Sequence, residues 1–200
     1  MKSFKPAFES FCKKNSIKKN SEQLDLVEKF EEFNALIQND KTLIKKLFSK
    51  APDKLGYYIH GDVGVGKTMV CNEFYQFVDV KKKKTHFNKF MIEVHDFLQK
   101  NQGNDKSDNL LVQFARSLKE KINLLYFDEF QVTNIVDAMI LGKLFESLFD
   151  EKIFILITSN IKINDLYKDG LQREQFLPFL KIIKNKMVEY ELKGDVDFRK

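Results

Sequence analysis

The stretch Gly56–Phe74 reads GYYIHGDVGVGKTMVCNEF and decides the fold. It passes from aromatic and apolar residues through a glycine-rich segment into Lys67 and Thr68. The segment Gly61–Thr68, GDVGVGKT, fits the pattern G-x-x-x-x-G-K-[ST], whose glycines let backbone N–H groups point at a phosphate. We interpret the stretch as a buried strand, a phosphate-binding loop and the start of a helix, whose positive end also favours an anion.

Each part of this loop has an expected role toward a nucleotide. Lys67 is expected to reach the β- and γ-phosphates, and Thr68 to supply a hydroxyl ligand to Mg²⁺. A merely flexible turn is the alternative, but the strand before the loop and the helix after it argue against that alternative. The predicted cofactor-binding residues are Gly61, Asp62, Val63, Gly64, Val65, Gly66, Lys67 and Thr68.

Strand and helix patterns alternate along the rest of the chain. Near-continuous apolar strands between helices predict an α/β fold, with a parallel sheet covered on both faces. Residues 3–49 are expected to be helical with Ser21 as an N-cap, and the run Lys81–Lys84 is expected to form a solvated loop. Strands are expected at 55–61, 85–87, 122–130, 153–160 and 186–192, and helices at 66–78, 88–100, 110–121, 133–149 and 172–184.

Two adjacent carboxylates end one of these apolar strands, in the segment LLYFDEF. Ligands of open α/β sheets bind beyond the carboxyl ends of the strands, so this pair is expected beside the phosphate loop. Asp128 is then placed to hold Mg²⁺ through water, and Glu129 to polarise the attacking water of a hydrolase. An acidic pair that merely caps a turn is the weaker interpretation once the phosphate loop is taken into account.

Two further polar residues follow later strands. Asn160 ends the segment IFILITSN, where a neutral amide can orient a water and sense the γ-phosphate. Arg173, in DGLQREQFLP, has two open interpretations. It is either an arginine finger inserted into a neighbouring subunit's site or a surface salt-bridge partner of Glu174 or Asp169.

Composition narrows the class of protein. The 200 residues, 43% of them hydrophobic and 32% charged, suit one soluble globular domain. No apolar run approaches the roughly 20 residues of a membrane span. Two cysteines without a metal-binding spacing fit a reducing compartment, so a cytoplasmic location is expected. The net charge of +5 comes from lysines spread along the chain, so a nucleic-acid partner is not expected.

Taken together, these motifs resemble the AAA+ ATPase family that contains the bacterial cell-division protein ZapE and its mitochondrial AFG1-like relatives. The resemblance runs from about Ser21 to Arg199 and includes HGDVGVGKTMV, HFNKFMIEVH, the segment from FDEF to FLPFL, and DVDFR. It implies a P-loop NTPase (AAA+, RecA-like) three-layer fold, with five parallel strands in the order 5-1-4-3-2 and helices on both faces. Residues 1–50 would form an N-terminal helical segment packed on a core of residues 51–200.

The resemblance also implies a function, namely Mg²⁺-dependent ATP binding and hydrolysis coupled to remodelling of a protein partner. That partner would be the FtsZ division ring in bacteria, or an inner-membrane protein client in the mitochondria-like branch. Glu129, Asn160 and Arg173 would be catalytic, with Asn160 as sensor 1 and Arg173 as a trans-acting finger. Thr68 and Asp128 would hold the metal ion. Hexamers are expected if a C-terminal lid is supplied.

Two departures from the family pattern leave alternatives open. Asn88 stands where the family has the second histidine of H-F-H. Family members continue past DVDFR into a segment that helps to complete the lid, and this portion is expected to be absent here. The chain could therefore be a nucleotide-dependent binding module with little hydrolysis, or a DNA-associated protein of the helicase-loader type. Turnover compared with ATP affinity would separate the first alternative from an ATPase.

Overall fold

The computed structural model describes residues 3–39, 54–101 and 107–194. Its centre is a parallel sheet in the order β2-β3-β4-β1-β5, which is the predicted order read from the other edge. The predicted fold class is therefore confirmed. Its strands are β1 (Gly56–His60), β2 (Lys82–His86), β3 (Leu124–Asp128), β4 (Phe154–Ser159) and β5 (Met187–Glu191).

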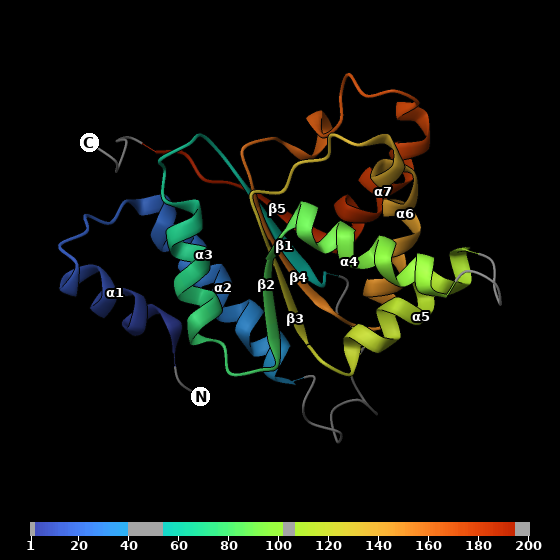
Figure 1. The fold of residues 1–200 in the computed structure, drawn as a ribbon. Coiled ribbons are helices and arrows are strands. Elements are labelled where there is room, and N and C mark those ends of the chain that lie inside the picture. The colour runs from blue at the N-terminus through green and yellow to red at the C-terminus, as the bar shows by residue number, and fades with distance from the viewer. Residues whose placement is uncertain (1–2, 40–53, 102–106, 195–200) are drawn as a thin grey trace.

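Helices cover both faces of the sheet and make a three-layer structure (Figure 1). On one side lie α1 (Phe4–Lys14), α2 (Ser21–Asn39) and α3 (Lys67–Phe77). On the other side lie α4 (Phe87–Lys100), α5 (Ser107–Lys119), α6 (Ile135–Asp150) and α7 (Arg173–Lys186), with a short 3-10 turn at Ile163–Asp165. None of the helices within the described ranges combines the length and apolar character needed to cross a bilayer.

The apolar strands form the middle of the core. Every residue of β1, β3 and β4 is buried, as expected for strands covered by helices on both faces. Aromatic rings fill the space between the layers: Phe30 and Phe33 of α2 pack on Phe74 of α3, while Phe127 of β3 packs on Phe90 of α4. This packing fixes the strand ends relative to the helices that begin there.

The N-terminal helical span differs from its prediction. In the described part it consists of two helices separated at residues 15–20, and residues 40–49 lie outside the described ranges, as does DVDFR. Asn20, not Ser21, caps α2. Its Oδ1 accepts a hydrogen bond of 2.7 Å from the backbone N–H of Gln23. In return, Oε1 of Gln23 accepts a hydrogen bond of 3.4 Å from the backbone N–H of Asn20. This reciprocal pair is a capping box.

The prediction of a solvated loop at Lys81–Lys84 is wrong for the last three of these residues. Lys82–Lys84 belong to β2, an edge strand that begins before the expected Thr85. Lysines are common on edge strands because their charges discourage pairing with another sheet. Their stems also cover aromatic rings, and the ammonium of Lys82 lies 4.9 Å from the centre of the Tyr75 ring. A run of charge was therefore compatible with a strand.

Candidate active site

The carboxyl ends of β1, β3 and β4 surround one cavity at the start of α3. Most of the predicted site residues meet there. The cavity is lined by Val63, Gly64, Gly66, Lys67, Thr68, Met69, Glu129, Thr158, Ser159 and Asn160. The phosphate loop and the residues that end β3 and β4 therefore share one space, as expected from the sheet topology.

The phosphate loop depends on glycines at close backbone approaches. Gly66 has a φ of +93°, and a Cβ atom there would lie 2.6 Å from Nε2 of Gln23. Gly61 would place a Cβ atom only 2.2 Å from the carbonyl oxygen of Leu192, in the segment that follows β5. A side chain at position 61 would collide with backbone, and one at position 66 would displace the Gln23 amide, so both glycines serve packing as well as backbone freedom.

Lys67 is the first residue of α3 and is buried. Its ammonium donates hydrogen bonds of 2.7 Å to the carbonyl oxygens of Gly61 and Asp62. Burial lowers the pKa of Lys67, because the charged form loses hydration. The side chain thus folds back onto the start of the loop, and Lys67 lines the cavity.

Asp128 ends β3 within a dense set of donors. Its Oδ1 accepts hydrogen bonds from the hydroxyls of Thr158 at 2.8 Å, Tyr126 at 3.2 Å and Thr68 at 3.3 Å. Burial by itself would raise the pKa of Asp128, but hydrogen bonds from Lys84 and Thr158 and the charge of Lys84 outweigh burial, so the pKa is lowered. Asp128 is held ionised next to Thr68.

Lys84 is a site residue that the sequence analysis missed. Its ammonium lies 2.8 Å from Oδ2 of Asp128, donates a hydrogen bond of 2.6 Å to Oδ1 of Asn72 and sits 4.9 Å from the centre of the Tyr126 ring. Its role could have been inferred from its position two residues before His86, since His86 is the last residue of a strand that pairs with β3. The run of four lysines indicated a solvated loop instead of a strand.

Glu129 follows Asp128 in a left-handed backbone conformation, with a φ of +55°. This conformation breaks the strand and leaves Glu129 exposed at the cavity, although a non-glycine residue rarely adopts it. Two hydrogen bonds join this turn to β4. The N–H of Glu129 donates to Oγ1 of Thr158 at 3.3 Å, and the N–H of Phe130 donates to the Thr158 carbonyl at 2.8 Å.

A second cavity adjoins the first and shares Glu129, Ser159 and Asn160 with it. Its lining also includes His86 and Asn88, the residue that departs from the family pattern. Glu129 and Asn160 therefore stand between the phosphate loop and a polar space beyond it. Such a position suits residues that orient a water molecule toward a terminal phosphate.

Arg173 is not brought into this site. It begins α7, and its Nη2 donates a hydrogen bond of 2.7 Å to the carbonyl oxygen of Asn164. Within the described residues it makes no ion pair with Glu174 or Asp169, so the interpretation as a salt-bridge partner lacks support.

Comparison with known proteins adds to this geometry. The model of the AFG1-like ATPase family matches residues 6–200. The chain belongs to the AFG1-like ATPase family. It is 40% identical over 172 residues to lactation elevated protein 1 homolog B of Danio rerio, covering 82% of this chain and 34% of that protein. It is 39% identical over 162 residues to cell division protein ZapE of Escherichia coli K12, covering 78% of this chain and 42% of that protein.

The chain thus spans less than half the length of either AFG1-like relative. Solved structures agree on the fold. The DnaC helicase loader has a TM-score of 0.57 at 12% identity, covering 88% of this chain and 92% of that one. AMPPCP-bound DnaA from Aquifex aeolicus has a TM-score of 0.55 at 17% identity, covering 92% of this chain and 51% of that one. At these identities the likeness places the AFG1-like chain among P-loop NTPase folds and says nothing of a partner.

Proposed function

We propose that this chain binds ATP with Mg²⁺ at the carboxyl ends of β1, β3 and β4 and hydrolyses it. The observation that carries the proposal is the shared cavity, which brings the phosphate loop together with Glu129 and Asn160. Membership of an ATPase family supports the same reaction. A cavity built only for binding would not need an exposed carboxylate next to the proposed position of the terminal phosphate.

The proposed roles follow from the position of each group. Backbone N–H groups of the loop and the N-terminal end of α3 bind the phosphates, and Lys67 reaches the β- and γ-phosphates. Glu129 accepts a proton from the attacking water. Asn160 orients that water through a neutral amide, which adds no further negative charge beside the phosphates.

The donors at Thr68 and Asp128 fit Mg²⁺, since both offer hard oxygen atoms and the two oxygens lie 3.3 Å apart. Among the described residues, no group of three or more His, Cys, Asp and Glu side chains could hold a metal ion by itself. This donor set suits an ion that takes its other ligands from phosphate oxygens and water. Mg²⁺ bound there would neutralise charge that develops on the phosphates.

Arg173 is proposed to act in the site of a neighbouring copy, in a hexamer or another closed assembly. Arg173 does not line the shared cavity but a separate surface cavity with Asn164 and Leu177, which supports a trans role over a cis role. An arginine that reaches across an interface stabilises transition-state charge only when the copies assemble. Turnover would then depend on protein concentration.

We further propose that hydrolysis remodels a protein partner in the cytoplasm. One relative is named as a cell division protein, which favours a division-ring partner such as FtsZ. An inner-membrane protein client is the corresponding proposal for the branch of lactation elevated protein 1. Binding of purified candidate partners in the presence of ATP, compared with ADP, would distinguish these two clients.

The experiment that tests the proposed reaction is steady-state ATP hydrolysis with Mg²⁺ over a range of protein concentrations, beside ATP affinity and a Glu129→Gln variant. A turnover rate per chain that rises with protein concentration and is lost in the variant would support an ATPase with shared sites. ATP binding without turnover at any concentration would indicate a nucleotide-dependent binding module. Absence of both binding and turnover would refute the proposal.

A further inference from the structure

Gln23 is a fully buried polar residue of α2 that contacts the phosphate loop from 42 residues away in the sequence. Its Nε2 donates a hydrogen bond of 3.1 Å to the carbonyl oxygen of Val65. The same nitrogen occupies the space beside Gly66 that a Cβ atom would need. A buried amide is costly without partners, so this position calls for an explanation.

The other end of the same amide completes the capping box of α2. Oε1 of Gln23 accepts from the N–H of Asn20, while Oδ1 of Asn20 accepts from the N–H of Gln23. A capping box is made equally well by Glu or Gln, because only an acceptor is required. The donor that reaches Val65 is available from Gln alone.

The bond to Val65 has a geometric consequence for the next residue. The carbonyl of Val65 and the N–H of Gly66 belong to one planar trans peptide unit, so they point in opposite directions. Holding the carbonyl toward α2 therefore turns the Gly66 N–H away from α2. Gly66 lines the cavity of the candidate active site, and at φ +93° its backbone has the freedom to turn the other way.

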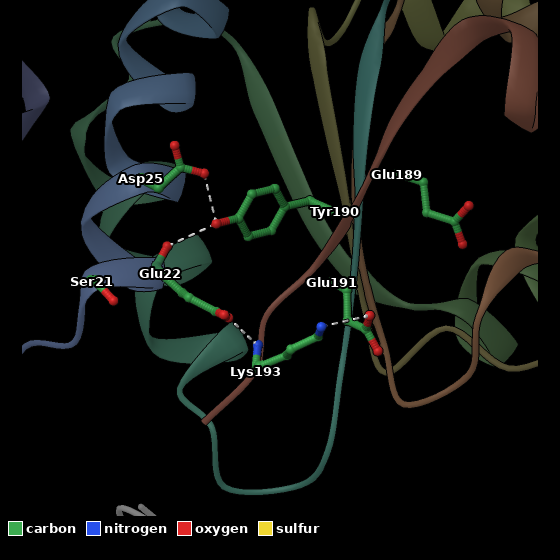
Figure 2. A pocket seen from close by; sticks show the side chains of 7 residues that line it. All are labelled: Ser21, Glu22, Asp25, Glu189, Tyr190, Glu191 and Lys193. Atoms are coloured by element: carbon green, nitrogen blue, oxygen red, sulfur yellow. Dashed lines mark hydrogen bonds and ion pairs between the residues drawn. The ribbon is translucent and has the colours of Figure 1, made fainter. Parts of the chain in front are cut away.

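Figure 2 shows what holds this part of α2 in place. The hydroxyl of Tyr190, on β5, lies 2.8 Å from Oδ2 of Asp25 and 3.0 Å from the carbonyl oxygen of Glu22. The backbone N–H of Lys193 donates to the Glu22 carboxylate. Glu22 and Asp25, which flank Gln23 in the first turn of α2, are thus held by β5 and by the segment that follows it. These contacts fix the backbone from which the Gln23 side chain reaches Val65.

We propose that Gln23 is a positioning residue that sets the direction of the Val65–Gly66 peptide and thereby the affinity of the loop for phosphate. The inference rests on the proposed function, since it concerns the same nucleotide site. Gln23 does not touch the phosphates. It acts through a peptide that offers one of the N–H donors of the phosphate cradle.

Two matched variants test the proposal. Gln23→Met removes the donor to Val65 with little change in volume and also removes half of the capping box. Asn20→Ala removes the other half of the box and leaves the bond to Val65 in place. The dissociation constant for a mant-labelled ATP with Mg²⁺ is expected to rise about tenfold in Gln23→Met, as for loss of one hydrogen bond, and to stay within about twofold in Asn20→Ala.

The Gly66 amide resonance, recorded with ¹⁵N-glycine labelling of the nucleotide-free protein, supplies a readout that a purely structural role would not move. It is expected to shift in Gln23→Met and to stay in place in Asn20→Ala. Equal nucleotide affinity in the two variants, or an unmoved Gly66 resonance in Gln23→Met, would overturn the proposal. Failure of the wild-type chain to bind ATP would count against the proposed function, while the resonance would still show whether Gln23 acts on the Gly66 peptide.

A third variant keeps the test valid if Gln23→Met does not fold. Gln23→Glu has the same shape and preserves the acceptor for Asn20, but its ionised carboxylate offers no donor to the Val65 carbonyl. The same weakening of nucleotide binding is expected. Wild-type affinity in a folded Gln23→Glu variant would contradict the proposed role of the donor.

Discussion

The ammonium of Lys84 and Oδ2 of Asp128 lie 2.8 Å apart, so the edge strand β2 supplies the cationic partner of the carboxylate that ends β3. The Asp128 side chain is 10% exposed and that of Lys84 31%. The pair therefore lies between a surface ion pair, which is worth little, and a fully buried one, whose loss leaves an unpaired charge. Oδ1 of Asp128 stays directed at Thr68.

This relationship predicts a measurable coupling between the two residues. In a double-mutant cycle of Lys84→Met and Asp128→Asn, we expect a coupling free energy of about 1–2 kcal/mol, measured by urea unfolding. Lys83 and Glu93 form a more exposed pair from the same strand and serve as the control, with at most about 1 kcal/mol expected. Additive effects of Lys84→Met and Asp128→Asn would show that the contact contributes nothing to stability.

The left-handed backbone of Glu129 predicts an unusual pattern of stability. Glu129→Asn should be as stable as the wild type or more stable by up to about 1 kcal/mol, because Asn tolerates this conformation. Glu129→Val should be less stable by about 1–2 kcal/mol, since a β-branched residue at positive φ is strained. Thermal unfolding measures both changes, and Glu129→Gln is the control for loss of charge. A destabilised Asn variant would mean that the backbone strain is negligible.

The same Glu129 variants should separate binding from turnover. Glu129→Gln is expected to lower ATP turnover by at least about 100-fold, which is the usual contribution of a general base, while ATP affinity changes little. Turnover under saturating ATP and a separate binding titration give the two quantities. Retention of wild-type turnover would remove Glu129 from its proposed role.

The position of Arg173 predicts complementation between two inactive variants. Glu129→Gln and Arg173→Ala should each be inactive alone. When the two are mixed in equal amounts, about a quarter of random neighbour contacts would combine an intact Glu129 with an intact Arg173. Partial recovery of ATP turnover in the mixture is therefore expected if Arg173 acts in trans. A mixture as inactive as its components would refute action across an interface.

His60 predicts a dependence of stability on pH. Burial lowers the pKa of His60 below its ordinary 6.5, and the nearby Glu189 and Glu191 only partly oppose this. The unfolded chain then binds a proton more readily than the folded chain, so stability is fully present above pH 6.5 and falls as the pH drops through and below that value. Urea unfolding between pH 8 and pH 5 should show a shallower loss in His60→Gln. An unchanged slope in His60→Gln would mean that other groups carry the pH dependence of stability.

Much of the site could be predicted because its chemistry is local in the sequence. A phosphate loop needs glycines at fixed spacing before a lysine and a hydroxyl, and apolar strands must end where the chain meets solvent. Glu129 and Asn160 were predicted beside Lys67 on this basis, and the structure places all of them around one cavity. Their catalytic roles stay predictions.

Other features depend on contacts that no local pattern encodes. Gln23 reaches the loop from a helix far away in the sequence, and nothing in the spacing of α2 marks it out. The lysine run that contains Lys84 favours a solvated loop by local pattern, although on an edge strand a run of charge and strand pairing are compatible.

The order of the sheet has a consequence for how the protein is made. β1 pairs with β4 and β5, whose residues lie about 100 and about 130 positions later in the chain. A ribosome therefore releases the phosphate loop long before the strands that flank it, and long-range parallel pairing is slow to form. The phosphate loop therefore stays without β4 and β5 until the last strand has emerged from the ribosome. Chains interrupted before Met187 should lack nucleotide affinity even though they carry the entire glycine motif.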